Sequence, residues 1–257
     1  MSSKPKHEEG VVAGTLRAIV PALLIALVIR TVLFQPVNIP SGSMKATLLV
    51  GDYLLVSKFT YGYSHYSMPF SPPLFSGRIF ASPPERGDII VFRSPTDESA
   101  DLIKRTIGLP GDRIQLIGGV VHINATPVKR ERAPDFVGED PCQAAPVFGM
   151  VARVRRWHET LPNGVSYDTL ECPLIAPVPD PDNTPVYTVP PGRYFMMGDN
   201  RHNSTDSRFR EVGYVPFENL IGRAQIVFFS VVEGESAWQV WRWPWSVRWS
   251  RLGQLVR

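Results

Sequence analysis

The chain has little cysteine, little net charge and no long uninterrupted apolar run. Its 257 residues include only two cysteines and carry a formal net charge of +3. Two cysteines far apart, with no histidine pair nearby, do not form the ligand pattern of a zinc site. A small charge, with basic and acidic residues interspersed, does not indicate a nucleic-acid partner. The sequence therefore predicts neither a metal site nor nucleic-acid binding.

The two cysteines, Cys142 and Cys172, are a candidate disulfide. A bridge between them would close a loop of about 30 residues and add about 3.5 kcal/mol of stability in the chain-entropy treatment. Such a bridge requires that this part of the chain face an oxidising compartment. The alternative is a pair of unrelated buried thiols.

The sequence also lacks a long amphipathic helix pattern after residue 35. It has instead 25 prolines, a share about twice the usual one, and several short apolar runs between turn residues. Such runs are typical of strands. They lie at 53–59, 89–92, 114–117, 120–123, 186–189, 194–197 and 221–229. We therefore predict a mainly β body, with a tight hairpin at Gly118 and Gly119.

The N-terminal apolar segment, residues 11–34, falls short of an uninterrupted membrane span. Its longest uncharged part, 18–29, has 12 residues, which is about 18 Å of helix against a hydrocarbon core of about 30 Å. That length suits a cleaved signal peptide. With Arg17 and Arg30 reaching the two interfaces, a span becomes feasible. We favour a single uncleaved transmembrane helix over 11–34.

Charge sets the expected orientation of this anchor. Lys4, Lys6 and Arg17 lie on its N-terminal side, and basic residues favour the cytoplasmic face of a membrane. Residues 1–10 would then be a cytoplasmic tail, and everything after Phe34 would lie on the outer face.

Composition shifts divide the rest of the chain. Residues 126–185 are polar, rich in proline and contain both cysteines, which predicts an inserted subdomain between two parts of the main β domain, 35–125 and 186–257. Residues 61–84 combine five prolines with six tyrosines and phenylalanines, and residues 237–257 hold five tryptophans and four arginines. Each of these two stretches either packs on the body or contacts lipid headgroups, and the sequence leaves both alternatives open.

The candidate nucleophile lies in a short polar turn. Directly after Pro40 come Ser41, Gly42 and Ser43. Proline favours extended backbone before it, and glycine permits a tight turn with close backbone approach. Such a turn can hold Ser43 outward with its own N–H free, and that N–H beside the Ser41 hydroxyl is the start of an oxyanion hole. A plain polar turn has the same pattern, so other parts of the chain must decide.

A serine nucleophile needs a base, and none of the five histidines lies in a recognised triad pattern. His202 is the strongest of them, because its loop is rich in Asp, Asn and Ser. The other option is a lysine. Lys104 is the candidate, since the apolar residues around it can bury the amine and lower its pKa by the roughly 2 to 3 units that a base needs. The plainer interpretation of Lys104 and Arg105 is a solvated basic pair.

Several motifs occur in an order that matches one known family. They are PSGSM with TLLVGD, GDIIVF, IKRTIGLPGD and GDNRHNSTDSR, within residues 40–208. In order and spacing they resemble the motif boxes of bacterial type I signal peptidase. The resemblance extends from the apolar segment to about residue 223 and is weaker in the inserted stretch. The chain departs from the family pattern at Ala46, where many relatives have proline, and in having one apolar segment where some have two.

The resemblance implies a role for each reacting residue. Ser43 would be the nucleophile and Lys104 the general base. The Ser41 hydroxyl and the Ser43 N–H would hold the oxyanion. Ser204 would hydrogen-bond Lys104 and orient it.

Around this centre the resemblance implies a supporting pair and a set of pockets. Asp206 and Arg208 would pair and hold one wall of the site in shape. Shallow pockets that select an A-x-A-like cleavage site would be lined by Val37, Ile39, Met44, Leu48, Leu102 and Ile103. This chemistry requires no metal and no organic cofactor.

The predicted protein is a membrane-anchored serine endopeptidase that removes N-terminal signal peptides from exported preproteins. It would lie in the bacterial plasma membrane, with the catalytic domain on the outer, periplasmic face. Its partners would be preprotein signal peptides and the lipid bilayer; the oligomeric state is not fixed by the sequence, and a monomer is expected. Two alternatives stay open: a narrow-specificity Ser/Lys peptidase for a pilus or conjugation precursor, and a non-catalytic membrane-tethered β module that binds peptides.

Overall fold

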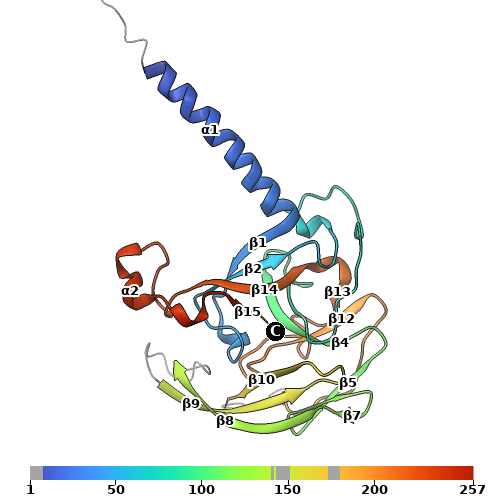
Figure 1. The fold of residues 1–257 in the computed structure, drawn as a ribbon. Coiled ribbons are helices and arrows are strands. Elements are labelled where there is room, and N and C mark those ends of the chain that lie inside the picture. The colour runs from blue at the N-terminus through green and yellow to red at the C-terminus, as the bar shows by residue number, and fades with distance from the viewer. Residues whose placement is uncertain (1–7, 140–141, 143–150, 173–179, 257) are drawn as a thin grey trace, which may run out of the picture.

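A long helix leads away from a β body in the computed structural model, which describes residues 8–139, 142, 151–172 and 180–256 (Figure 1). Most of the predicted tail, residues 1–10, lies outside the described residues. The helix, α1, spans Glu8–Val28 and continues as a π-helical turn, Ile29–Leu33. No helix within the described ranges is both long enough and apolar enough to cross a membrane.

The body is mainly β, as predicted, and its largest sheet has eight antiparallel strands. Their order is β1-β2-β14-β3-β4-β12-β13, with β15 paired to β14. The strands are β1 (Phe34–Asn38), β2 (Asp52–Ser57), β3 (Ile89–Arg93), β4 (Asp101–Gly108), β12 (Arg193–Met197), β13 (Val215–Pro216), β14 (Leu220–Ser230) and β15 (Gln254–Leu255). Four of the apolar runs that the sequence assigns to strands lie in this sheet: 53–59 on β2, 89–92 on β3, 194–197 on β12 and 221–229 on β14.

A second sheet contains the predicted hairpin. Its order is β11-β5-β6-β7, formed by β5 (Arg113–Ile117), β6 (Val120–Ile123), β7 (Thr126–Pro127) and β11 (Tyr187–Thr188). Ile117 pairs with Val120 across the turn, and the two glycines between them have φ values of 55° and 76°. Positive φ at both central residues is what a two-residue turn of this type requires, so the hairpin at Gly118 and Gly119 is confirmed.

A third sheet lies in the stretch for which the sequence predicted only a polar insertion. It has the order β10-β9-β8, with β8 (Lys129–Glu139), β9 (Val151–Thr160) and β10 (Ser166–Glu171). Charged residues alternate poorly with apolar ones here, and some are buried in pairs: Arg201 donates to Glu159 at 2.6 and 3.0 Å. Buried ion pairs remove the alternation by which a strand is recognised. The division into a catalytic domain and an insertion stays a prediction.

The disulfide between Cys142 and Cys172 gives a first testable prediction. The two residues are bonded in the structure, with Cα atoms 5.6 Å apart. The Cys142→Ser/Cys172→Ser protein should lose about 3.5 kcal/mol of unfolding free energy, because its denatured chain regains the entropy of an open loop. Urea unfolding of the oxidised and double-serine proteins measures this difference. Equal midpoints would show that the bridge contributes nothing.

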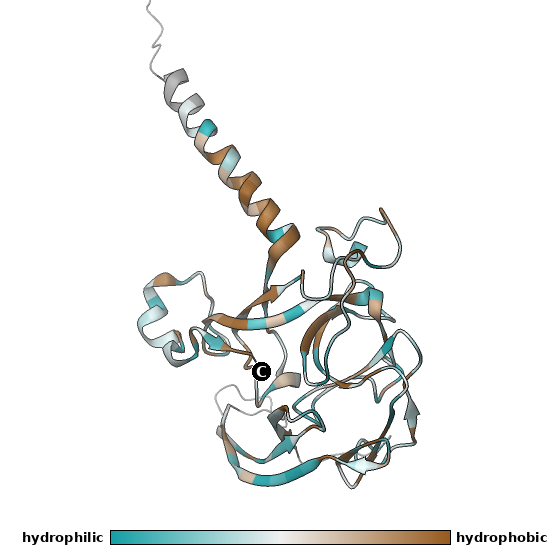
Figure 2. Ribbon diagram, turned by 45° about the vertical axis from the view of Figure 1, so that its right-hand side comes forward, coloured by the Kyte–Doolittle hydropathy of each residue, from teal (hydrophilic) through white to brown (hydrophobic). Residues whose placement is uncertain are grey.

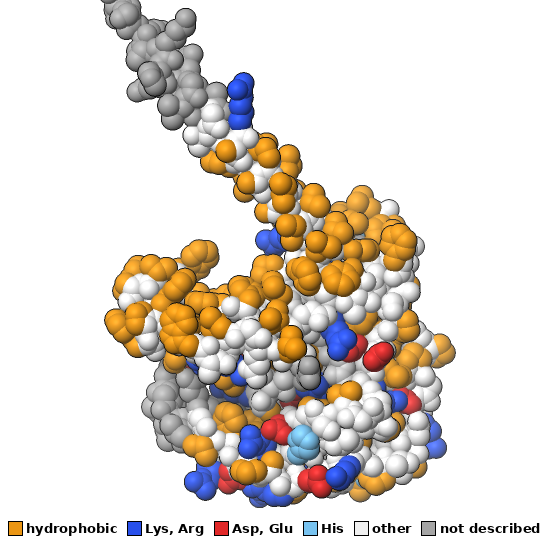
Figure 3. Space-filling model, in the orientation of Figure 1, with side chains coloured by type: hydrophobic (Ala, Val, Ile, Leu, Met, Phe, Trp, Pro, Cys, Tyr) orange, Lys and Arg blue, Asp and Glu red, His pale blue; other side chains and the backbone are white. Residues whose placement is uncertain are grey.

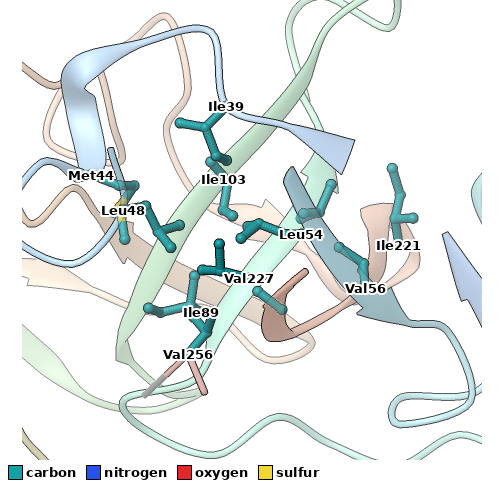
Figure 4. Packing of buried hydrophobic residues seen from close by; sticks show 12 residues of the cluster. Ile39, Met44, Leu48, Leu54, Val56, Ile89, Ile103, Ile221, Val227 and Val256 are labelled. Carbon is teal, nitrogen blue, oxygen red and sulfur yellow. The ribbon is translucent and has the colours of Figure 1, made fainter. Parts of the chain in front are cut away.

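A hydrophobic cluster joins the serine turn to the large sheet. Ile39, Met44 and Leu48 flank the turn and pack with Leu54 and Val227 of the sheet (Figure 4). These side chains are fully buried. Burial of apolar surface is the main favourable contribution to folding. The apolar residues in and next to the serine turn therefore fix its position on the sheet.

The remaining helices are short, and the aromatic stretches near them are largely exposed. The short helices are η2 (Gly42–Met44), η3 (His65–Ser67), η4 (Phe217–Asn219), η5 (Val240–Arg242), α2 (Trp243–Ser246) and η6 (Trp249–Arg251). Phe70 and Phe80 of the proline-rich loop are exposed, as are Trp238 and Trp241 of the tail. Brown segments concentrate on the helix and the neighbouring upper part of the body (Figure 2).

Candidate active site

The serine turn is a single 3-10 turn entered from extended backbone. Ser41 has φ −126° and ψ 153°, and the turn Gly42–Met44 follows, with the Lys45 N–H bonded to the Gly42 carbonyl. Ser43 is 8% exposed. Its Oγ lies 3.4 Å from Ser41 Oγ. Among the hydrogen bonds of the described residues, none uses the Ser43 N–H, so this donor remains available beside the two hydroxyls.

Asn200 holds this turn from the opposite wall. Its side-chain amide donates to the Gly42 carbonyl at 3.0 Å, and its backbone N–H donates to the Ser43 carbonyl at 3.1 Å. Two bonds from one buried residue fix both carbonyls of the turn. Asn200 was not predicted as a site residue, and its place inside the GDNRHNSTDSR motif is the sequence signal that could have identified it.

Lys104 reaches the serine from strand β4. It pairs in register with Ile90 of β3, so its backbone is fixed in the middle of the large sheet. Its Nζ lies 2.8 Å from Ser43 Oγ and 2.9 Å from the Ile103 carbonyl. The residue is 3% exposed. The two residues that sequence reasoning paired, 61 positions apart, are therefore in hydrogen-bond contact.

Burial lowers the pKa of Lys104 to about 8, and the negative charges of Asp206 and Asp199 oppose that shift. An ammonium group loses its hydration inside the protein, so the neutral amine is favoured there. A neutral amine at hydrogen-bond distance from a hydroxyl can accept its proton. This is the chemistry that the pair can perform.

The wall beside Lys104 is built on a buried ion pair. Arg208 donates to Asp206 from Nε at 2.9 Å and from a terminal nitrogen at 2.9 Å. Burial alone would raise the pKa of Asp206, but the Arg208 charge and hydrogen bonds lower it overall. The N–H of Gly198 also donates to this carboxylate, at 3.0 Å. The carboxylate thus ties the start of the motif to its end.

Ser204 differs from the expectation. Its hydroxyl donates to Asp206 at 2.8 Å. Within the described residues, Ser204 forms no hydrogen bond to Lys104. The Lys104 amine instead contacts Ser43 and the Ile103 carbonyl. An ionised carboxylate is a stronger acceptor than an amine that is itself donating, which explains the choice.

A second buried ion pair lies next to the first. Arg105 donates to both carboxylate oxygens of Asp199, at 2.8 and 2.7 Å, and its guanidinium stacks 4.0 Å from the Tyr167 ring centre. The Thr47 hydroxyl donates to the same carboxylate at 2.5 Å. Arg105 is fully buried, so it is not half of a solvated basic pair, and the plainer interpretation of Lys104 and Arg105 is wrong.

His202, the alternative base, is engaged elsewhere. One ring nitrogen contacts the Cys172 carbonyl and the other lies 2.9 Å from an Asp182 oxygen. Burial opposes protonation of His202, but these acceptors raise its pKa overall. With both ring nitrogens occupied, His202 has none to offer Ser43.

The predicted pocket residues fall into two groups. Ile39, Met44, Leu48 and Ile103 belong to the cluster under the serine turn, and Val37 of β1 packs against it while partly exposed (Figure 4). The remaining predicted pocket residue, on β4, is Leu102. It packs against a separate cluster that includes Tyr61, Ile90 and Phe92.

The chain is similar in sequence to known proteins of one family. The family described as signal peptidase, peptidase S26, matches residues 12–229. The signal peptidase I of Rickettsia typhi is 47% identical over 81% of this chain and 76% of its own length. The signal peptidase I of Rickettsia prowazekii is 46% identical over the same shares of the two chains. A signal peptidase I structure from Enterococcus faecalis V583 is 26% identical, with a TM-score of 0.32, over 55% of this chain and 97% of that one.

A mainly β fold, a serine in its site and these matches define a serine endopeptidase, a hydrolase of peptide bonds. Within that class, the chain belongs to the signal peptidase family, peptidase S26. The non-catalytic alternative is therefore wrong.

Gly198→Ala should damage the site directly. An added Cβ would lie 2.3 Å from Ser204 Oγ and 2.6 Å from the Ser43 carbonyl oxygen, so the serine turn must move. A displacement of about 1 Å can cost roughly 100-fold in rate. Peptide cleavage by Gly198→Ala and by Gly14→Ala, whose Cβ meets nothing within 4 Å, measures the effect. Equal rates for both variants would contradict the tight approach of the wall to Ser43.

Proposed function

We propose that this peptidase removes N-terminal signal peptides from exported preproteins, cutting after an A-x-A-like site. The observation that carries the proposal is the 2.8 Å contact between Lys104 Nζ and Ser43 Oγ in a chain of this family. Relatives that align with most of this chain are signal peptidase I proteins.

In the first step, the Ser43 oxygen attacks the carbonyl carbon of the scissile bond while Lys104 takes the hydroxyl proton. The Ser43 N–H and the Ser41 hydroxyl donate to the oxyanion that forms. When the tetrahedral intermediate collapses, the Lys104 ammonium gives its proton to the departing amine, which leaves as the new N-terminus of the mature protein. The signal peptide remains as an ester on Ser43.

In the second step, Lys104 is neutral again and takes a proton from water, which attacks the ester. Collapse of this second intermediate returns the proton to Ser43 and releases the signal peptide with a free carboxylate. No cofactor enters either step. Asp206 and Arg208 hold the wall that bounds Lys104. Ser204 donates to the Asp206 carboxylate, so it would influence Lys104 through that carboxylate.

The substrate would bind as an extended strand, since backbone hydrogen bonds then supply affinity and alternate side chains enter pockets. Val37 and Leu102 are the predicted pocket residues that are partly exposed while packing against a hydrophobic cluster, and Ile103 of the cluster under the serine turn is 8% exposed. Narrow pockets over a packed cluster would accept only small side chains. This is the physical basis for an A-x-A-like preference.

The proposal includes a membrane location through α1. The helix exposes a series of apolar side chains: Ile19, Val20, Leu23, Leu24, Ile25, Leu27 and Val28. Arg17 and Arg30 flank that series. We expect the N-terminus inside and the catalytic body on the outer face. Membrane fractionation, followed by treatment of intact cells or spheroplasts with an external protease, tests this topology. Recovery of the protein outside the membrane fraction, or resistance of its catalytic body to the external protease, would contradict the proposed anchor.

Substrate scope is tested with a panel of purified preproteins. A general signal peptidase should cut most of them at one bond each. Cleavage of a single pilus or conjugation precursor, with all others intact, would instead favour the narrow-specificity peptidase.

The rate should depend on pH through Lys104. Only the neutral amine can accept a proton, so kcat/KM should rise as pH increases through about 8, the pKa to which burial lowers Lys104, and level off above it. A series of rates from pH 6 to pH 10 on one peptide substrate measures the profile. A rate that still rises steeply at pH 10 would contradict the lowered pKa of Lys104, and a rate that does not change between pH 6 and pH 10 would contradict a lysine base.

A further inference from the structure

A cavity of about 310 Å³ opens where α1 meets the β body. Arg30 of the π-helical turn lines one side, Lys58 and Arg93 line the sheet side, and Tyr66 and Phe70 of the proline-rich loop complete it. Neither Ser43 nor Lys104 lines it, and Ile221 is the lining residue that also belongs to the hydrophobic cluster under the serine turn. The cavity therefore calls for its own explanation.

Two cations of this cavity form no ion pair with a carboxylate of the described residues. Lys58 is 1% exposed, and its amine donates to the Ser67 carbonyl. Arg30 has no ion pair among the described residues. The third cation of the cavity, Arg93, forms an ion pair with Asp101 at 3.0 Å. The cavity thus has an excess of positive charge that an anion would neutralise.

The two acidic residues that line the cavity, Asp101 and Glu98, offset only part of the charge of its three cations. Asp101 is bound to Arg93, and Glu98 accepts a hydrogen bond from the Tyr66 hydroxyl at 3.1 Å. Burial and the nearby Arg30 charge lower the pKa of Lys58 to about 8, although the charge of Asp101 opposes that shift. Below that pH the ammonium predominates, so Lys58 is charged near neutrality although it is buried.

The surroundings of the cavity are apolar on the side of the helix. Leu27, Val28 and Val32 of the helical segment are exposed, and so is Phe70 across the cavity. Hydrophobic side chains cover the helix and the face of the body beside it (Figure 3). A ligand with an anionic group and long apolar chains matches both parts: the charge lies between the cations and the chains lie along the helix.

We propose that this cavity binds the phosphate of an anionic phospholipid, such as phosphatidylglycerol, with Arg30 and Lys58 as its cationic contacts. The phosphate accepts hydrogen bonds from both side chains, and the acyl chains cover the exposed side of α1. The inference rests on the proposed membrane location, and it does not depend on peptide cleavage. A bound lipid there would fix the angle between the helix and the body.

Native mass spectrometry of the full chain, released from detergent containing phosphatidylglycerol, tests the proposal. The wild type should retain one phosphatidylglycerol. Arg30→Gln should weaken retention about fivefold and Arg30→Gln/Lys58→Met about 25-fold, at about fivefold per basic contact. Arg17→Gln is the matched control, because it removes an arginine of the same helical segment that does not line the cavity. Circular dichroism confirms that each variant is folded.

Three results would overturn the proposal. The first is equal retention by the wild type and folded Arg30→Gln. The second is an equal loss in Arg17→Gln, which would indicate general charge attraction. The third is binding of inorganic phosphate to the detergent-solubilised wild type as tightly as phosphatidylglycerol, which would make the cavity a free-anion site. Failure of preprotein cleavage with lipid retention intact would contradict the proposed function and support this inference.

Discussion

Lys104→Met is expected to lower kcat/KM about 10⁴-fold while the protein stays folded. Methionine fills nearly the same volume and suits a position that is 3% exposed, but it cannot accept the Ser43 proton. A positioned general base contributes up to about 10⁴-fold to the rate, and the oxyanion donors and substrate binding remain in the variant. Rates on a peptide with an A-x-A site, with circular dichroism of each variant, measure the loss.

Lys45→Met is the matched control for that experiment. Lys45 is also buried and lies two residues from Ser43, but its amine pairs with Glu233 at 2.9 Å. Its replacement should cost less than about tenfold in rate, as expected for a group that touches no reacting atom. If Lys104→Met and Lys45→Met lose activity equally, the effect is general damage to the turn, and the assignment of Lys104 fails.

Asp199→Ala is expected to produce the largest loss of stability. It leaves Arg105, which is fully buried, without the carboxylate that accepts two of its hydrogen bonds. Removing one partner of a buried pair costs about 3–5 kcal/mol, and each kcal/mol lowers Tm by about 2–4 °C in a protein of this size. Thermal unfolding followed by circular dichroism measures the shift.

An exposed ion pair supplies the comparison. Glu131 pairs with Lys129 at 3.1 Å, and both side chains are more than half exposed. Glu131→Ala should change stability by less than about 1 kcal/mol. In addition, the double variant Asp199→Leu/Arg105→Met should recover part of the lost stability, because it removes both charges of this buried pair. An Asp199→Ala protein as stable as Glu131→Ala would show that the buried pair does not hold the wall.

The sequence predicts β2, β3, β12 and β14 of the large sheet because they are apolar runs bounded by turn residues. Strands β1, β4, β13 and β15 of the same sheet were not among the predicted runs. Gly118 and Gly119 are predictable for a similar reason, since only glycine adopts their φ values without cost. The roles of Ser43 and Lys104 are predicted from the order of the sequence motifs, which reflects the chemistry of the site rather than the fold. The resemblance also implied the Asp206–Arg208 pair, whose members are two residues apart.

Features that depend on distant partners could not be predicted from the sequence. Strands β8 to β10 carry charges that are satisfied across the sheet, so no alternation marks them. The Arg105–Asp199 pair joins residues 94 positions apart, and the partner of Ser204 depends on which acceptor the fold brings nearest. Ala46 has a φ of 120°, a value closed to proline, which gives a structural reason for the departure from the family pattern.

Cleavage of a purified preprotein, with the new N-terminus read by mass spectrometry, tests the central claim most directly. The wild type should release one mature protein, cut after the second small residue of its A-x-A site, and folded Ser43→Ala should release none. Release of the same product by folded Ser43→Ala at the wild-type rate would show that Ser43 is not the nucleophile and that the Ser43–Lys104 contact is not the catalytic centre.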